Sequence, residues 1–387
     1  MEDLYARLGA SSAKEDVHLA IKNLNKGIAP GAFCKVLPDI LGGDAEWLNV
    51  MHADGAGTKS ILAYLYWIET GDISVWENVA IDALVMNLDD LLCVGATDQF
   101  MVTSTLGRNK RLVPGEVIKA IIEGTESFCA RMRDLGIGIY FAGGETADVG
   151  DVVKTILIDS NITCRFPARN LIEASRIEAG NRIVGLGSFG QTTYETAWNS
   201  GIASNGITLA RHVLLHPDYG SRFPESIDSH LQEKGGYGGK FRLTDPILKN
   251  HRDLGQGLLS PTRSFAPLIH KIIKNGLGDS VTGIIHNTGG AHSKVKNFIG
   301  PVRVVKNLPE MPEIFQLIRK EAGLDLPEFL KVMNGGIRME IYCKPGTEAQ
   351  VKSMATDFGI SVFDLGEVET SEQPEVKIQT SGQSWMY

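Results

Sequence analysis

A carboxylate, two glycines, a hydroxyl and an amine follow one another in Asp54-Gly55-Ala56-Gly57-Thr58-Lys59. The alternating run before them, residues 47–52, predicts a strand, and the apolar run from Ile61 predicts a helix. Amides at a helix N-terminus attract anions, lysine adds a positive charge, and aspartate offers the hard oxygen that Mg²⁺ prefers. A junction of this kind suits a metal-bound polyphosphate.

The segment differs from both common nucleotide-binding loops. Its Gly-Thr-Lys order lacks the spacing of a P-loop, and Ser60 stands where a dinucleotide fingerprint needs its third glycine. A strand-to-helix turn that binds nothing is therefore the alternative interpretation.

A second group of acids lies in the apolar run 77–94, which predicts a long helix. Asp82 and Asp89 are seven residues apart and share one face, while Asp90 lies about 100° further round. Carboxylates among Leu, Val and Met are costly to bury unless a cation offsets them. That cation is either a metal ion or a Lys or Arg at a domain edge.

A third candidate is Ala142-Gly143-Gly144-Glu145-Thr146-Ala147. Residues 137–142 predict a short buried strand that ends at the two glycines, where a ligand can approach the backbone. Glu145 and Thr146 add oxygen atoms, although a simple tight turn explains the pattern equally well. Three segments that bring acids together with glycine or lysine are what a Mg²⁺–nucleotide site requires.

Strands alternate with helices over both halves of the chain, which predicts an α/β or α+β fold. Residues 167–179 look like the seam between two domains, and 182–187 open a second series. A short amphipathic helix is expected over 16–25. The polar, glycine-rich stretch 217–257 indicates a long surface excursion rather than core.

Composition excludes several classes of protein. The length of 387 residues allows two domains, and a net charge of −8 argues against a nucleic-acid binder. No run approaches the roughly 20 apolar residues of a membrane span, and Met1–Leu4 show no secretory signal. The five cysteines lie far apart without C-x-x-C, which favours reduced thiols in the cytoplasm and signals no zinc site.

Taken together, these segments resemble the phosphoribosylformylglycinamidine cyclo-ligase family, also called aminoimidazole ribonucleotide (AIR) synthetase. The likeness runs in order along nearly the whole chain. The family motifs D-G-x-G-T-K, I-D-x-x-x-M-x-x-[ND]-D-L, G-G-E-T-A, G-I-H-S-N-G, L-L-x-P-T-R, H-x-T-G-G-G and N-x-G-[IV]-G-M are similar to residues 54–59, 81–91, 143–147, 201–206, 258–263, 286–291 and 334–339.

The substrate-side motifs depart from the family pattern. Ala203 replaces a histidine, Ala291 a glycine, Phe265 a tyrosine and Arg338 a glycine. About ten residues near 189–198 look inserted, and the glycine-rich amino-terminal loop is reduced to residues 30–35. The nucleotide motifs are intact, so the departures concern the identity of the substrate more than ATP binding.

The resemblance implies a two-domain α/β (α+β) fold. Residues 1–168 would form an ATP-binding domain whose sheet completes a β-barrel across a homodimer, and residues 169–387 an α+β sandwich domain. It also implies ATP-dependent ring closure of formylglycinamidine ribonucleotide to AIR in purine biosynthesis, through phosphorylation of the amide oxygen. The implied partners are a small ribonucleotide and a second copy of the chain, with no nucleic acid or membrane.

Site residues follow from the matched motifs. The implied catalytic residues are His286 and Lys59, the implied Mg²⁺ ligands are Asp54, Asp90 and Glu145, and Asp89 is a possible substitute ligand. The implied ATP contacts are Asp54, Gly55, Gly57, Thr58, Lys59, Asn87, Asp90, Gly143, Gly144, Glu145 and Thr146. The implied substrate contacts are Ser204, Asn205, Gly206, Thr288, Gly289 and Gly290.

Three alternatives stay open at the level of sequence. Selenophosphate synthetases and small-molecule kinases share the implied architecture, and the former carry a reactive Cys-Lys that Cys34-Lys35 resembles. A loop cysteine without chemical role explains Cys34 as well. A nucleotide-binding paralogue without catalysis would fit the altered Ala203, Ala291 and Arg338, and His286 alone could simply cap a strand.

Overall fold

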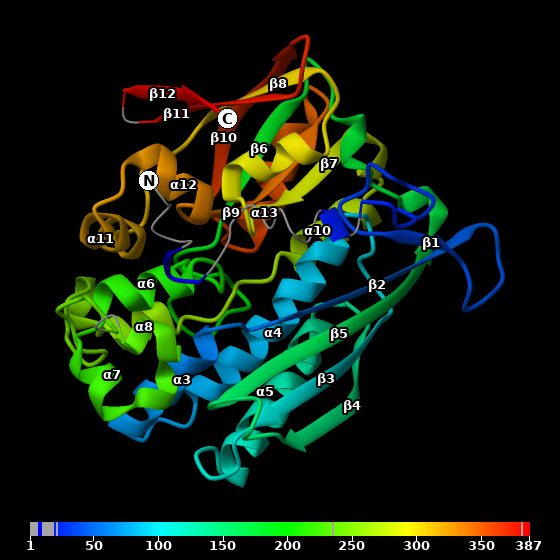
Figure 1. The fold of residues 1–387 in the computed structure, drawn as a ribbon. Helices are drawn as coiled ribbons and strands as arrows, with labels where there is room; N and C mark the ends of the chain where they lie inside the picture. Colours follow the sequence, from blue (N-terminus) through cyan, green and yellow to red (C-terminus); the bar gives the residue numbers. More distant parts are fainter. Residues whose placement is uncertain (1–6, 10–18, 21, 234–235, 381) are drawn as a thin grey trace.

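The computed structural model describes residues 7–9, 19–20, 22–233, 236–380 and 382–387. The helix expected over 16–25 lies mostly outside these residues. The chain forms two sheets with helices packed on them, and the described parts of its two halves meet along one long helix, α4 (Figure 1). The predicted mixed α/β fold with two sheets is confirmed.

The first sheet has the strand order β1-β2-β5-β3-β4. Its strands are β1 (Val36–Pro38), β2 (Trp47–Gly55), β3 (Phe100–Arg108), β4 (Ile139–Asp148) and β5 (Ile156–Pro167). Helices α4 (Val75–Leu92) and α5 (Gly115–Asp134) pack together against one face, and α3 (Lys59–Thr70) follows β2. The strand predicted over 47–52 and the helices predicted from Ile61 and over 77–94 are confirmed here within a few residues.

The opposite face of this sheet is covered by no helix among the described residues (Figure 1). Met51, Thr163, Met101 and Tyr140 lie opposite one another in one row across β2, β5, β3 and β4. The exposed fractions of Met51, Met101 and Tyr140 are 62%, 53% and 52%. A row of large apolar side chains therefore faces outward.

Strand β4 differs from its prediction. It does not end at Gly143-Gly144 but continues to Asp148, and most of it is exposed at the sheet edge. The register against β3 shifts between Val102 and Ser104, and a Cβ on Gly144 would come within 1.9 Å of the Ser104 carbonyl oxygen. The glycines thus accommodate a β-bulge, and Glu145 lies within the strand.

The second sheet has the order β12-β11-β8-β10-β6-β9-β7. Helices α10 and α13 pack together, with α13 against β6 and β10, while α11 packs on α6. The bounds are β6 (Arg182–Gly187), β7 (Val281–His286), β8 (Val302–Asn307), β9 (Ile337–Cys343), β10 (Val362–Thr370), β11 (Glu375–Thr380), β12 (Gln383–Met386), α6 (Ile207–Leu214), α10 (Ala266–Lys274), α11 (Glu313–Ala322), α12 (Leu326–Val332) and α13 (Thr347–Asp357).

The stretch 217–257 is not a surface excursion, so that prediction is wrong. It contains the short helices α7 (Asp218–Arg222), α8 (Ser229–Glu233) and α9 (Leu254–Leu258). Tyr219, Tyr237 and Leu243 are fully buried in the core shared with α3 and α6. Their spacing is irregular, so no helical or strand period marked them in the sequence.

Candidate functional site

The first buried acid of α4, Asp82, is held by Lys59 at the start of α3. The Lys59 amine lies 2.9 Å from Asp82 Oδ2 and donates to the carbonyl oxygens of Ala203 and Ser260 at 3.1 and 2.6 Å. Thr262 donates both its backbone N–H and its hydroxyl to Asp82 Oδ1. Burial lowers the pKa of Lys59, although the Asp82 charge opposes this. In this arrangement the amine joins the two halves of the chain.

The second acid, Asp89, is paired with Arg338 on β9. Arg338 also donates to His286 Nε2 and to the carbonyl oxygen of Arg263, and its guanidinium lies 4.9 Å from the centre of the Phe265 ring. Both side chains of the pair are fully buried. The arginine that replaces a family glycine therefore neutralises Asp89. The role of Asp89 as a substitute Mg²⁺ ligand would require this pair to open.

The third acid, Asp90, lies between two histidines. Its Oδ1 is 2.6 Å from His286 Nδ1 on β7, and its Oδ2 is 3.4 Å from His52 Nε2 on β2. Burial opposes ionisation of Asp90, but the hydrogen bond and charge of His286, with the charges of Lys294 and His52, outweigh it and lower the pKa of Asp90. Burial and the Arg338 charge lower the pKa of His286. Both ring nitrogens of His286 thus have partners.

The loop 29–35 brings Cys34 next to Asp90. Cys34 Sγ is 3.3 Å from the Asp90 carbonyl oxygen, and burial together with the Asp90 charge raises the pKa of the thiol well above its usual value. On the other side, Lys294 donates to the Thr288 hydroxyl at 2.8 Å and lies 4.3 Å from the centre of the Phe33 ring. The amino-terminal loop therefore meets the loop that follows β7.

The phosphate-loop candidate lies at the end of β2. Asp54 is exposed and accepts a hydrogen bond from the Gly55 amide at 2.7 Å. Asp159 on β5 packs over Gly55 so closely that a Cβ there would come within 1.8 Å of its Oδ1. Burial and the nearby charge of Asp54 raise the pKa of Asp159. Two carboxylates therefore crowd the end of this strand.

Glu145 lies in the same register row, Gly55–Asp159–Thr105–Glu145, but three strands away from β2. Strand spacing puts it about 14 Å from Gly55. Asp54, Asp90 and Glu145 therefore do not form a cluster on one chain of the described structure. Gly143, Gly144 and Thr146 accompany Glu145 on β4. The proposed magnesium set stays a prediction.

Asn87 and Thr58 have well-defined neighbours. The Asn87 amide nitrogen donates to Ser160 Oγ and O at 2.7 and 2.8 Å and to the Asp54 carbonyl oxygen at 3.2 Å. Thr58 pairs with Thr208 at 3.0 Å, and Gly57 adopts φ +56° before α3. Asn87 therefore ties the end of β2 to β5, and Thr58 ties the start of α3 to α6.

Two alanines of the predicted substrate loops adopt a backbone conformation that is unusual for residues other than glycine. Ala203 and Ala291 adopt φ of +56° and +43°, the left-handed region that favours glycine. Ser204 lies 3.3 Å from the Thr262 hydroxyl, and Asn205 contacts Met86. Thr288 is buried, while Gly289 is exposed and Gly206 and Gly290 have positive φ.

The inserted segment near 189–198 packs on the buried Arg263. This arginine pairs with Glu195 at 2.6 Å and donates to the carbonyl oxygens of Gly187 and Phe189 at 2.9 Å. A cavity of about 520 Å³ lies between the insert, the loop 252–264 and the edge of α4. A second cavity of about 780 Å³ lies between α11, α12 and β12. Neither cavity is lined by Asp54, Asp90 or Glu145.

Sequence reasoning missed three residues of this region: His52, Asp159 and Lys294. His52 was detectable in principle, because it lies two residues before Asp54 and shares its strand face. Asp159 alternates with the buried Ile158 and Ser160 on β5. Lys294 lies in a short irregular helix, and no sequence signal marks it.

Comparisons with known proteins agree with these motifs. Residues 35–165 match the family model described as AIR synthase related protein, N-terminal domain. The phosphoribosylformylglycinamidine cyclo-ligase of Saccharolobus solfataricus is 30% identical over 323 residues, which cover 83% of this chain and 79% of that protein. The same-named protein of Pyrococcus furiosus is 28% identical over 334 residues, which cover 85% and 81%.

Solved structures share the fold at low identity. The HypE–HypF complex aligns over 97% of this chain and 99% of that chain, with a TM-score of 0.57 and 14% identity. T. maritima PurL complexed with FGAR aligns over 89% of this chain and 45% of that chain, with a TM-score of 0.54 and 15% identity. Across the described residues, no helix has the length and apolar character needed to cross a membrane.

Proposed function

Because the chain belongs to the phosphoribosylformylglycinamidine cyclo-ligase family, we propose that it closes the imidazole ring of formylglycinamidine ribonucleotide, with consumption of ATP and formation of AIR, ADP and phosphate. The observation that carries this proposal is the 30% identity along 83% of the chain. The active site would lie where α4 meets the loops after β6 and β7, because the family motifs converge there.

The chemistry needs little covalent participation by the protein. An amide oxygen is a poor leaving group, and its phosphorylation converts it into phosphate, which an internal nitrogen displaces. Holding the substrate folded makes ring closure effectively unimolecular. The residues of the site therefore act mainly by positioning and by neutralising charge.

The end of β2 fits a divalent cation. Asp54 and Asp159 lie close enough for the charge of one to raise the pKa of the other, and no Lys or Arg among the described residues pairs with either. We place ATP-bound Mg²⁺ at Asp54, with Asp90 and Glu145 as the further predicted ligands and Asp159 as an added one. Bound Mg²⁺ supplies neutralisation of phosphate charge. Gly55 has no Cβ and therefore leaves room for the Asp159 carboxylate. Gly57 adopts the positive φ of the turn before α3.

Lys59 and His286 remain proposed catalytic residues, but each would first have to lose a contact that it makes in this structure. Lys59 would contact phosphate only if its contacts with Asp82, Ala203 and Ser260 open when the halves move. His286 holds Asp90 through Nδ1 and accepts from Arg338 at Nε2, so proton transfer would require one partner to leave. As they stand, both residues position α4 against the second half.

The substrate would lie against the loop that follows β7. Lys294 and the Thr288 hydroxyl offer a cation and a donor beside Gly289 and Gly290, a combination that suits the ribonucleotide phosphate. Ser204 contacts Thr262 and Asn205 contacts Met86 on α4, and with Gly206 these residues of the loop before α6 would contact the rest of the substrate. This assignment follows the family motifs.

A homodimer is the second part of the proposal. The uncovered sheet face presents Met51, Met101 and Tyr140, and a copy of the same sheet is complementary to it in apolar character. Such pairing would complete a β-barrel. It would also bring a Glu145 from the partner copy toward the strand ends of the first chain. We place the protein in the cytoplasm, where its five buried, unpaired cysteines would stay reduced.

ADP release measured with and without formylglycinamidine ribonucleotide tests the function. We expect release that depends on the ribonucleotide and yields AIR in equal amount. Turnover with selenide or with a small alcohol acceptor instead would favour a synthetase or kinase, and ATP binding without turnover would make the chain a non-catalytic paralogue.

A further inference from the structure

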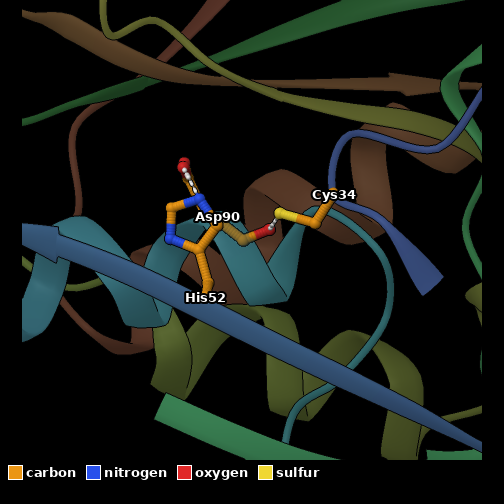
Figure 2. A group of neighbouring side chains, drawn as sticks. All are labelled: Cys34, His52 and Asp90. Atoms are coloured by element: carbon orange, nitrogen blue, oxygen red, sulfur yellow. Dashed lines mark hydrogen bonds and ion pairs between the residues drawn. The ribbon is translucent and has the colours of Figure 1, made fainter. Parts of the chain in front are cut away.

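Three side chains with metal-binding atoms converge beside the proposed active site. Cys34 from the loop before β1, His52 from β2 and Asp90 from α4 each offer one ligand atom, and these atoms all lie within 4.8 Å of one another. Figure 2 shows the Asp90 carboxylate against the His52 ring and Cys34 Sγ against the Asp90 carbonyl oxygen. Within the described part of the chain, this is the one such group of three or more His, Cys, Asp or Glu residues.

The orientation of His52 leaves one ring nitrogen free for a cation. The Asn87 amide nitrogen faces four oxygen atoms, on Ser160, Asp54 and Ala83, so its Oδ1 must be the atom that lies 2.8 Å from His52 Nδ1. His52 therefore donates through Nδ1, and its Nε2 carries the lone pair. A metal-binding histidine is typically held in this way through its other nitrogen.

The free Nε2 faces an acceptor. It lies 3.4 Å from Asp90 Oδ2, while Asp90 Oδ1 is taken by His286. Two acceptors that face each other repel unless a proton or a metal ion lies between them. Cys34 Sγ closes the third side, and the Cys34 and Asp90 side chains are almost fully buried. The His52 side chain is 27% exposed, which gives an ion access from solvent.

The ligand set selects the class of metal. One sulfur, one imidazole nitrogen and one carboxylate oxygen suit Zn²⁺ and related divalent transition metals, whereas Mg²⁺ prefers oxygen alone. Three protein ligands leave a fourth position open in a tetrahedral site. The geometry points to a transition-metal site of the Zn²⁺ class formed by Cys34 Sγ, His52 Nε2 and Asp90 Oδ2.

Binding has a defined chemical balance and a structural consequence. The Cys34 thiol releases its proton to solvent as the metal–sulfur bond forms, and the hydrogen bond to the Asp90 carbonyl oxygen is given up. The bound ion fastens the loop 29–35 to β2 and α4. Because Asp90 Oδ2 serves one ion at a time, this ion competes with Mg²⁺ at Asp90.

Titration of the reduced, metal-stripped full chain with Co²⁺ under anaerobic conditions tests the site. We expect one equivalent of Co²⁺ to give visible d–d bands and a near-ultraviolet thiolate-to-cobalt band, which one equivalent of Zn²⁺ then removes. The readout does not depend on ring closure, so failure here and failure of the proposed activity are separate results.

Variants locate the ligands. Cys34→Ser should lose the thiolate band, and His52→Gln should weaken Co²⁺ binding and change the visible bands. Cys129→Ser, a buried cysteine on α5, is the matched control and should leave both unchanged. Thermal melts of each variant would check that it is folded. A thiolate band that survives Cys34→Ser, or no Co²⁺ bands in the wild type, overturns the site.

Discussion

His286 Nδ1, at the end of β7, lies 2.6 Å from Asp90 Oδ1 on α4, so the two halves of the chain share a buried hydrogen bond at the proposed active site. The other nitrogen of the same ring accepts from Arg338. A histidine held on both sides fixes the position of an acid more readily than it moves a proton. The geometry therefore favours a role for His286 in positioning Asp90 over a role in proton transfer.

Removal of His286 tests this distinction. We expect His286→Ala to lower kcat/KM on the order of 10- to 100-fold, because Asp90 loses a charge-assisted partner and its position. The limbs of the pH–rate profile should keep their shape. His292→Gln is a comparison variant, because it alters another buried histidine of the second half, one that contacts Glu340. Disappearance of one limb in His286→Ala alone would assign proton transfer to His286.

Lys59 and Asp82 form a second buried link, and double substitution measures it. Lys59→Met should destabilise the protein by about 3–5 kcal/mol, since Asp82 is left buried and unpaired. The double variant Lys59→Met/Asp82→Leu should recover most of this loss in urea unfolding. Lys35→Met, an exposed lysine, is the control. A single variant as stable as the wild type would contradict the assignment.

Asp54 should matter for turnover rather than for folding. It is exposed, and its carboxylate is free on one side. We expect Asp54→Asn to reduce ATP turnover on the order of 100-fold with an unchanged melting temperature, because one anionic ligand of the ATP-bound cation is lost. Asp151→Asn, in the exposed turn before β5, should retain activity. Equal kinetics of the Asp54 and Asp151 variants would remove Asp54 from the site.

The uncovered sheet face should set the oligomeric state. Met101→Glu places a charge in the middle of the apolar row and should convert a dimer into a monomer of 42.0 kDa, as measured by light scattering after gel filtration. Ile122→Glu on the exposed side of α5 should leave the mass unchanged. A monomeric wild type would end the dimer proposal and with it the contribution of a partner Glu145.

His212 should couple stability to pH. Burial and the charge of Arg211 lower the pKa of His212 to about 4 from the usual 6.5, and its ring packs at a tilt of 42° against Tyr237. The unfolded chain takes up the proton first, so the contribution of neutral His212 is present above pH 6.5 and is lost as the pH falls through 4. The loss amounts to about 3 kcal/mol.

Unfolding of the wild type and of His212→Phe measured from pH 7 to 4 checks this value. The variant should lose about 3 kcal/mol less over that range, whatever its stability at pH 7. His230→Gln, on the exposed α8, should follow the wild type. Parallel pH dependence in all three proteins would contradict the prediction.

Strong local patterns explain which parts of the fold were predictable. Residues 47–52, 77–94 and 182–187 carry regular apolar spacing, and each became the expected strand or helix. The bulge at Gly143-Gly144 was not visible, because it depends on the register between β3 and β4. The buried residues of 217–257 were missed since their apolar side chains follow no period.

The sequence by itself determined the family, the motifs and the presence of buried acids on one helix, because those depend on residue identity and spacing. Only the tertiary structure decided which side chains contact each acid: Lys59 for Asp82, Arg338 for Asp89, and His286 and His52 for Asp90. It alone brought Cys34 to His52 and Asp90. Partners far apart in the chain meet through packing of whole elements, and no local spacing records that packing.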